Sequence, residues 1–309
     1  MSKIKNILMM AFAKGQVSTE AAEIKRYIGV APCKILCVNP TKAQIKELMG
    51  YEPQEEPKYV GTQEVDGKKI SYARVCFVIK TDAEKCGIDT TQMMSFFIRN
   101  RYVKGSQSGK YQVIDEFGRT AWATEDVIKA KGKIMYKDGT MEANITQNYR
   151  PLYEGEEDLT NFIKAYLNIP NVMDYVNGTW VMKPADALQD ALCRLDEVAN
   201  YFNGDFKEIK DAVALQPNNK VKVLFGIRNT DDGKEYQDIY TRLVLRNSSN
   251  NINAFQKEIE ERKNSGALSN RVYEFCDLKE YKVVATDFNT NTPSNDDPFA
   301  NAANVGTPW

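Results

Sequence analysis

The chain has 309 residues, of which 42% are hydrophobic and 27% are charged, the balance of a folded protein with a sizeable core. It contains no histidine, so nucleophilic mechanisms built on Ser–His or Cys–His pairs and the usual catalytic zinc sites are excluded. The formal net charge is −1, so there is no overall basic excess to indicate a nucleic-acid partner, and any cationic surface has to be a local arrangement.

Other classes of protein are disfavoured by what the sequence lacks. No apolar run is long enough to span a bilayer, and we interpret the start, MSKIKNILMMAFAKGQ, as mature sequence because its apolar stretch is short. The six cysteines are scattered, which predicts reduced thiols in a cytosolic protein. Cys33 and Cys37 are followed by no second pair, and no nucleotide-binding or paired acidic motif occurs. We therefore expect no metal, no cofactor and no enzymatic activity.

The first part of the chain predicts a helical arm followed by a short α/β segment. Residues 1–30 are expected to form this arm, with Ser18 or Thr19 as its cap and an end near Gly29. The arm either packs on its own domain or contacts a neighbouring molecule. An apolar strand over 33–39 and an amphipathic helix over 41–50, closed by glycine, are expected next.

Residues 65–123 predict the central β-structure. Val65-Asp66-Gly67-Lys68 has the composition of a hairpin turn, and ISYARVCFVIK alternates with period two as a strand does. MMSFFIRNRYVKG and KYQVIDEFGRTAWA continue the pattern, with a second turn at 115–118. One face would carry Arg, Lys and aromatic rings, the combination that binds single-stranded nucleic acid. An ordinary half-solvated sheet has the same pattern, since Arg and Tyr suit outward positions.

The second half of the chain predicts helices and a second β block. A brief helix capped by Thr124 and an irregular passage over 133–155 precede the helical segments, and a polar helix and two strands close this region. The helices are expected over 154–171, 185–202, 206–215 and 252–266, and the strands over 220–227, 235–247, 271–278 and 279–286. Residues 31–286 then form either one composite domain, with a helical insertion around 156–215, or two unequal domains.

Residues 287–309 are rich in Asn, Thr and Pro, which predicts a disordered acidic tail. The tail contains Asp296, Asp297, Pro298 and Phe299 and ends in Trp309. Acids beside a ring on a flexible tether can bind a partner or compete for the protein's own cationic groove. An idle end is an equally good interpretation.

Several stretches resemble single-stranded DNA-binding proteins of large tailed bacteriophages, including crAss-like phages. They are LCVNPTKAQIKELMG, FVIKTDAEKCGID, YQVIDEFGRTAW, EEDLTNFIKAYLNIPN and LQPNNKVKVLFGI. The tail is similar to the acidic, aromatic-ending tails with which such proteins recruit replication and recombination partners. In the bacterial family the motif is Asp-Asp-x-Pro-Phe at the very C-terminus, whereas here the intervening residue is missing and the motif lies ten positions from the end.

The resemblance implies an α+β protein with an OB-fold-like antiparallel β-barrel core and helical insertions. It implies a non-enzymatic protein that coats and protects single-stranded DNA without sequence specificity, in the cytoplasm of an infected bacterial host. Phage or host replication and recombination proteins would bind the tail, self-association is an open expectation, and no membrane is involved. The alternative is a structural or assembly protein of a phage particle, with the same aromatics as subunit contacts. An accessory enzyme using carboxylates is a weaker third hypothesis.

The candidate binding residues come from the two β blocks. The rings expected to stack on bases are Tyr72, Phe97, Tyr102, Tyr111, Trp122, Tyr236 and Tyr240. The cations expected to contact phosphates are Arg74, Lys80, Arg99, Arg101, Lys104, Lys110, Arg119, Lys222, Arg242 and Arg246.

Overall fold

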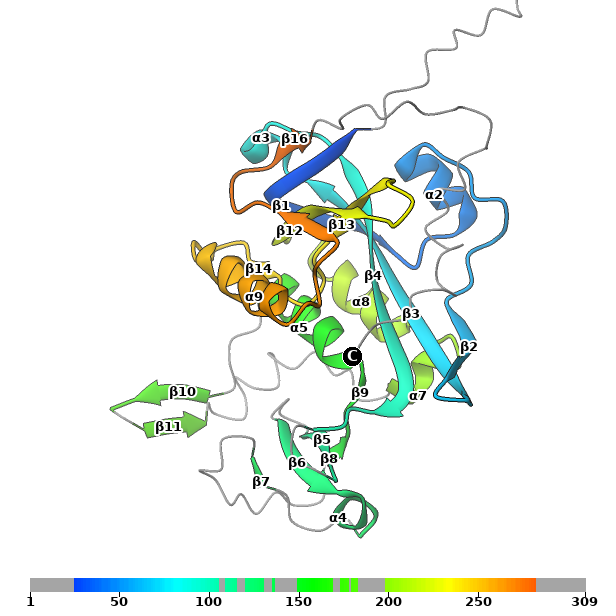
Figure 1. Cartoon of the computed structure of the whole chain (residues 1–309), viewed down its shortest axis with the longest axis vertical. Helices are drawn as coiled ribbons and strands as arrows, with labels where there is room; N and C mark the ends of the chain where they lie inside the picture. Colours follow the sequence, from blue (N-terminus) through cyan, green and yellow to red (C-terminus); the bar gives the residue numbers. More distant parts are fainter. Residues whose placement is uncertain are drawn as a thin grey trace, which may run out of the picture.

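The computed structural model describes residues 25–105, 109–115, 120–130, 135–136, 149–168, 173–177, 179–182 and 198–281 (Figure 1). Within these residues the protein is a mixed α+β structure dominated by antiparallel strands. The strands are β1 (Arg26–Val38), β2 (Val60–Val65), β3 (Lys68–Thr81), β4 (Thr91–Tyr102), β5 (Lys110–Asp115), β6 (Thr120–Thr124), β7 (Met135–Tyr136), β8 (Tyr149–Pro151), β9 (Tyr153–Glu154), β10 (Met173–Val176), β11 (Thr179–Met182), β12 (Val221–Asn229), β13 (Glu235–Ile239), β14 (Leu245–Arg246), β15 (Arg271–Tyr273) and β16 (Lys279–Tyr281). The helices are α2 (Lys42–Met49), α3 (Ala83–Cys86), α4 (Glu125–Lys129), α5 (Glu156–Tyr166), α7 (Val198–Tyr201), α8 (Lys207–Ala214) and α9 (Asn253–Asn264).

The main sheet has ten strands and curls into a half-barrel (Figure 1). Its order is β13-β12-β1-β3-β4-β9, and β14 and β15 pair with β12, β16 with β1 and β2 with β3. Every one of these pairs is antiparallel. The expected antiparallel β-core with helical additions is therefore confirmed for the described residues.

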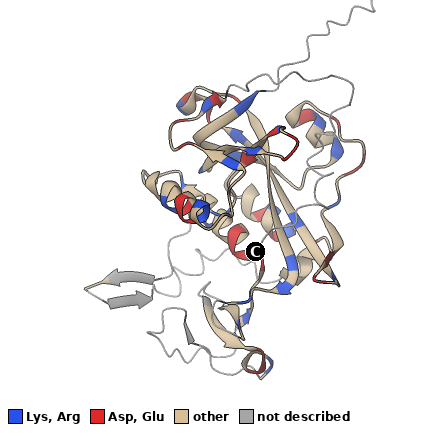
Figure 2. Cartoon of the chain, in the orientation of Figure 1, with Lys and Arg blue, Asp and Glu red and all other residues tan. Residues whose placement is uncertain are grey.

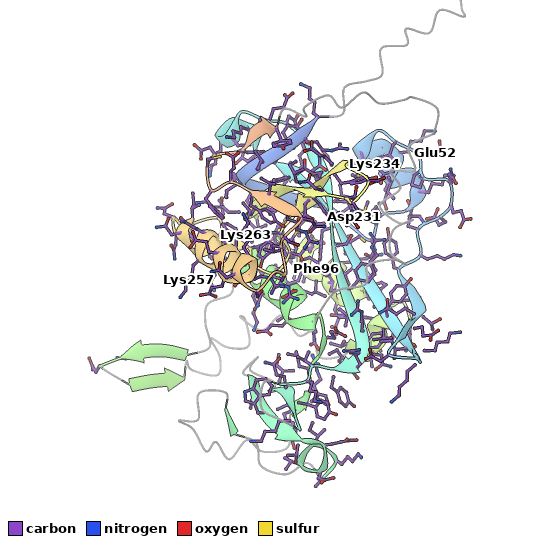
Figure 3. All side chains as sticks on the ribbon, viewed as in Figure 1. Glu52, Phe96, Asp231, Lys234, Lys257 and Lys263 are labelled. Carbon is purple, nitrogen blue, oxygen red and sulfur yellow. The ribbon has the colours of Figure 1, made fainter. Side chains whose placement is uncertain are left out.

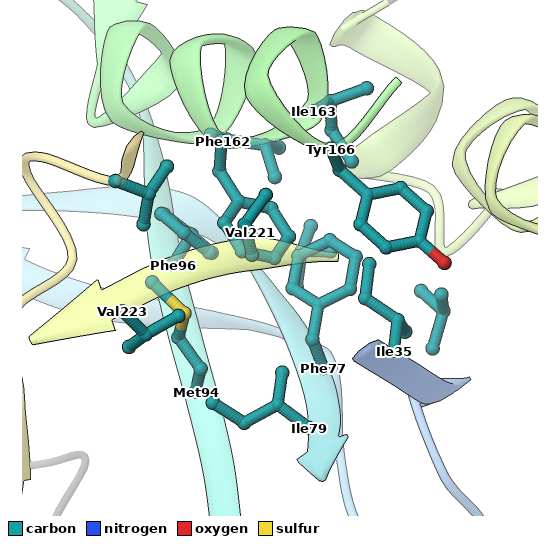
Figure 4. Packing of buried hydrophobic residues seen from close by; sticks show 14 of the residues in the cluster. Ile35, Phe77, Ile79, Met94, Phe96, Phe162, Ile163, Tyr166, Val221 and Val223 are labelled. Atoms are coloured by element: carbon teal, nitrogen blue, oxygen red, sulfur yellow. The ribbon is translucent and has the colours of Figure 1, made fainter. Parts of the chain in front are cut away.

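The concave face of this sheet holds the main hydrophobic core. Successive strand residues point to opposite faces, so the buried Val75, Phe77 and Ile79 share one face of β3. Phe162 of α5 packs on Phe77 and Phe96, with ring centroids 4.7 and 5.2 Å apart (Figure 4). α5, α7 and α8 supply the helical half of the core. We call this face of the sheet the core face.

The opposite face, here called the outer face, is covered in two separate places. Val30 and Leu224 lie under α9, in a second core that includes Phe255 and Ile259. Cys76 and Val78 are fully buried although neither belongs to the main core. Because α2 contacts β4 and carries a fully buried Ile45, we infer that α2 covers this second part of the outer face.

A smaller sheet, in the order β7-β6-β5-β8, packs beside the end of β4 (Figure 1). Its own core contains Val113, Ala121 and Ala123, with Val127 and Ile128 of α4 packed against them. The backbone of the segment after β4 joins this sheet, since Val103 hydrogen-bonds with both Gln112 and Leu152. β10 and β11 form a separate hairpin.

The start of α5 fixes this helix directly against β4. Gly155 is its N-cap residue and has φ +83° in the left-handed region. A Cβ atom at this position would clash with the backbone carbonyl of Phe97. The absence of a side chain therefore lets the helix end reach the strand backbone.

Several local predictions are confirmed. Thr41 and Gln44 form a capping box at α2, which ends at Gly50 with φ +79°. Thr124 caps α4 by accepting a hydrogen bond from the Val127 N–H. Asp66 and Gly67, both with positive φ, form the turn that joins β2 to β3.

Other predictions are wrong. The helix expected to end near Gly29 is replaced from Arg26 onward by β1, because this segment pairs with β12 and β16. The passage expected to be irregular contains β7, β8 and β9, whose partners lie elsewhere in the chain. The strand expected over 235–247 ends at Ile239. The β10–β11 hairpin has no counterpart among the predicted elements.

Some predictions lie outside the described residues. They are the arm up to residue 24, the turn residues 116–118, most of the helix over 185–202, and the tail over 287–309. In the portions that are described, no helix combines the length and apolar character needed to cross a membrane.

Candidate nucleic-acid interface

The outer face of β3 and β4 carries a compact group that we call the Tyr72 patch, formed by Tyr72, Arg74 and Phe97. The register sets Arg74 opposite Phe97, and Tyr72 and Phe97 have ring centroids 5.9 Å apart. The Arg74 guanidinium lies 5.2 Å from the Phe97 ring centroid, a cation–π contact. Gly61 lies under the Tyr72 ring, where a side chain would overlap it. Tyr72 and Phe97 remain half-buried, so parts of both rings can still be reached.

The burial of Arg74 corrects its predicted role as a phosphate contact. Its exposed fraction is 6%, and one guanidinium nitrogen, Nη2, lies 3.3 Å from the Ser95 Oγ to which it donates. A side chain enclosed in this way holds the Tyr72 patch together and cannot reach a phosphate in the solvent. The alternation in the sequence correctly predicted its face but not its burial.

The arginines at the far end of β4 are compensated by acids. Arg99 donates to Glu154 across 3.1 Å, and Arg101 Nε lies 2.8 Å from the same carboxylate. Arg101 also contacts Asp66, 3.3 Å away, in the β2–β3 turn. Figure 2 shows basic positions along β3 and β4 and acidic positions in the neighbouring β2–β3 turn. Any phosphate contact of Arg99 or Arg101 therefore has to replace an existing ion pair.

A second group of rings lies where β4 meets the small sheet. Tyr102 packs edge to face on Tyr111 and Tyr153, with centroids 6.0 and 5.9 Å apart, and Tyr153 packs on Phe202 at 5.3 Å. Tyr102 has an exposed fraction of 41% and is the one aromatic among the exposed large apolar side chains of the described residues. We call this group, together with Lys104, the Tyr102 surface.

Cations lie beside these rings. Lys104 is exposed, and its backbone forms an isolated antiparallel β-bridge with Tyr111. The two side chains therefore project from the same face of this strand pair. Lys129 of α4 forms an ion pair with Glu125 across 2.8 Å. The pKa of Lys129 is raised, mainly by its hydrogen bond to Glu125, and nearby Tyr102 adds a smaller effect. The Tyr102 surface thus combines an exposed ring with Lys104, and Lys129 lies at its border.

The Tyr72 patch and the Tyr102 surface lie on opposite faces of β4. Arg99 is opposite Tyr72 and shares the outer face, whereas Tyr102 is opposite Tyr153, which packs on the main core. One nucleic-acid strand could contact both groups only by passing around the end of β4. The structure therefore does not join the predicted residues into a single trough along one face.

Among the remaining predicted residues, two lie on the face of the β5–β6 pair opposite Tyr111, and others lie outside the described residues. Trp122 packs against Gly105, on the opposite face of the β5–β6 pair from Tyr111. Lys110, half-buried, lies on the Trp122 side. Arg119 and the tail residues Asp296, Asp297, Pro298, Phe299 and Trp309 lie outside the described residues.

In the second β block, the burial of Tyr240 corrects its predicted role as a ring that stacks on a base. It has an exposed fraction of 4%, belongs to the core under α9, and donates to Glu258 across 2.7 Å. Burial, followed by the Glu258 contact, raises the pKa of its hydroxyl. A ring sealed in this way cannot stack on a base. Tyr236 is half-buried and packs on Arg228 at 5.6 Å. Arg242 and Arg246 are half-buried near β14.

Two predicted lysines also have partners in the described structure. Lys80 forms an ion pair with Asp89 across 2.9 Å, and Lys222 donates to the backbone carbonyl of Ser249. Both lie on the outer face, at the end of the sheet away from the Tyr72 patch.

Sequence reasoning missed Tyr153, Phe202 and Lys129, which belong to or border the Tyr102 surface. Tyr153 falls in a two-residue strand, too short for an alternation to be visible. Phe202 and Lys129 come from segments interpreted as helical, where the sequence gives no sign that they approach β4.

The described residues offer no group of histidine, cysteine, aspartate or glutamate side chains that could hold a metal ion. Cys33, Cys37, Cys76, Cys86 and Cys276 are free. The side chains of the Tyr102 surface offer aromatic rings, hydroxyl groups and an ammonium group, which can stack, hydrogen-bond and attract anions. No protein-family model, curated protein or solved structure matches this chain.

Proposed function

We propose that the protein binds single-stranded DNA without sequence preference, with an OB-fold-like core, during phage replication and recombination. The observation that carries this proposal is the Tyr102 surface, where an exposed ring, two packed tyrosines and exposed lysines lie together. Every base has a π-face, so rings of this kind bind bases with little dependence on sequence. The curled antiparallel sheet is compatible with a partly open barrel.

In this mechanism Tyr102 stacks on a base while Lys104 contacts the adjoining phosphate, and Lys129 contacts a phosphate by exchanging its ion pair with Glu125. Tyr111 and Tyr153 hold the Tyr102 ring in place, so that little conformational freedom is lost on binding. The Tyr72 patch offers a second stacking position on the other face of β4. A base–ring stack contributes about 1–3 kcal/mol, so the affinity depends on a few rings.

The test is a titration of the full chain with oligo(dT) at low salt, followed by intrinsic fluorescence. Tyr102→Ala should raise Kd by about 5-fold to 150-fold, the equivalent of 1–3 kcal/mol. Leu215→Ala is the matched control, because Leu215 is an exposed apolar side chain outside the Tyr102 surface, and it should leave Kd unchanged. Absence of binding by the unmodified chain at low salt, or binding that ignores salt, would overturn the proposal.

A second candidate is an assembly protein that uses the same rings as subunit contacts. The ion pairs of Arg99 and Arg101 with Glu154 favour it, because they leave less free positive charge beside the rings. Exposed tyrosines are also common in protein interfaces. Light scattering separates the candidates: large oligomers that form without DNA and persist in high salt indicate assembly.

For the tail we propose recruitment of phage or host replication proteins in the cytoplasm of the infected cell. Asp296, Asp297 and Phe299 can supply charge and an apolar anchor for such a partner. The tail can also compete with DNA for the cationic surface. A chain that ends at Thr286 should then bind oligo(dT) more tightly than the full chain, and equal affinities would argue against competition.

A further inference from the structure

Four lysines from three neighbouring strands lie together on the outer face of the main sheet. Lys34 of β1 is directly opposite Lys80 of β3. Lys222 of β12 is opposite Pro32, two residues from Lys34, and therefore shares its face. Lys220, just before β12, contacts Asp82, which follows β3. We call these four side chains the lysine strip.

The lysine strip occupies a part of the outer face that neither helix covers. On one side Val30 and Leu224 lie under α9, and on the other Cys76 and Val78 are buried where we place α2. Figure 1 shows α9 and α2 on opposite sides of the β1 and β12 strands. Lys34, Lys80, Lys220 and Lys222 are all partly exposed between these two covers.

The charges of the lysine strip are only partly compensated. Lys220 lies 2.5 Å from Asp82, Lys80 lies 2.9 Å from Asp89, and Lys222 donates to the Ser249 carbonyl. Lys34 makes no hydrogen bond or ion pair with another described residue. Four lysines against two aspartates leave a positive balance. Like charges directly opposite each other in a sheet are destabilising, so the strip keeps an unfavourable arrangement that an anion would relieve.

We propose that the lysine strip binds phosphate groups of the nucleic-acid backbone, with Lys34 as its central contact. This proposal rests on the DNA-binding function proposed above and adds Lys34 and Lys220 to the expected phosphate contacts. Lysine is a compact point charge with three rotatable donors, and it can contact a phosphate without a fixed geometry. The strip has no exposed ring among its members, so it holds the backbone while the Tyr102 surface binds bases.

The probe has to be long enough to reach both places. β4 runs for 12 residues from Thr91, which is opposite Lys80, to Tyr102. This length corresponds to about 36 Å at the rise of a β-strand. A stacked strand advances about 3.4 Å per phosphate, so about eleven nucleotides span the distance. An oligo(dT) of about 30 nucleotides leaves room for the path around the sheet.

The experiment compares the salt dependence of binding in full-length variants. Lys34→Gln should reduce the slope of log K against log salt by about 0.7, the value of one phosphate contact on a single strand. Lys34→Arg keeps the charge and should retain the slope. Lys263→Gln removes the same charge from α9, labelled in Figure 3, and should change nothing.

The melting temperature gives a second readout. If Lys34 served only to stabilise the fold, its removal would lower Tm. Removing Lys34 relieves its opposition to Lys80, so the Tm of Lys34→Gln should be unchanged or higher. An unchanged salt slope in Lys34→Gln, or a lower Tm with loss of affinity in both Lys34 variants, overturns this inference. If the unmodified chain still binds and Tyr102→Ala still weakens binding, the proposed function stands without the lysine strip. If the unmodified chain does not bind oligo(dT), both proposals fail.

Discussion

Glu156 is an acid buried at the start of α5, and its replacement tests how the Tyr102 surface is held. The exposed fraction of its side chain is 1%, and it receives two hydrogen bonds from Arg150, one of 2.9 Å from Nη1 to Oε2 and one from Nη2 to Oε1. It also accepts the backbone N–H of Tyr153 at 3.1 Å. Glu156 therefore ties β8, β9 and α5 together beside the ring that packs on Tyr102.

We expect Glu156→Ala to lower the free energy of unfolding by about 3 kcal/mol. Removing one partner of a buried ion pair costs about 3–5 kcal/mol, because the other charge stays buried without compensation. We use the lower end of this range of free energies, because the Arg150 side chain is 29% exposed and can recover some hydration. Tm should fall by about 6 °C or less, because the shift is about 2 °C per kcal/mol at 250 residues and smaller for a longer chain.

Urea unfolding followed by circular dichroism measures this difference. Glu157→Ala is the control, because Glu157 is the exposed neighbour in the same helical turn and its removal should change stability by about 0.5 kcal/mol or less. Equal stabilities for the two alanine variants would refute the reasoning. Glu156→Gln should fall between them, since the amide keeps an acceptor for Arg150 but loses the charge.

Two further predictions concern other acidic side chains. Asp66→Asn removes the ion pair with Arg101 and should tighten oligo(dT) binding by up to about fivefold, because an exposed pair is worth at most about 1 kcal/mol. Asn tolerates the positive φ of this turn. Weaker binding would contradict the prediction. Asp158→Asn should stabilise the protein at pH 7 and not at pH 3. Burial raises the pKa of Asp158, and Glu157 and Glu258 add to this against Arg242 and Arg262. Its ionisation therefore lowers stability as pH rises above the ordinary value near 3.8, and urea unfolding at both pH values should show a gain at pH 7 alone.

The parts of the fold that were predictable are those set by local patterns. β3 and β4 alternate over many residues, so their strand character and the two faces of Tyr72 and Phe77 follow from period two. α2 has a cap and helical spacing, and α5 has helical spacing with acids in its first turn, all within a few residues. The face of a strand residue could thus be predicted, but its burial could not.

Burial depends on elements far away in the chain. Arg74 is on the predicted face, yet its exposed fraction is 6%. Tyr240 alternates in sequence with Tyr236, but β13 ends at Ile239, and the ring enters the core under α9. The segment from Arg26 has helix-forming neighbours, and its pairing with β16 joins residues about 250 positions apart, which no local pattern can indicate.

The contact between Gly155 and the backbone of β4 has a use in recognising related chains. A side chain at this position would push α5 off the strand, so a protein that keeps this junction has to keep glycine there. The neighbouring ion pair fixes an arginine five residues earlier and a glutamate one residue later. Arginine, four intervening residues, then Gly-Glu at the start of an amphipathic helix forms a short signature. It can be sought in sequences too divergent for whole-chain comparison.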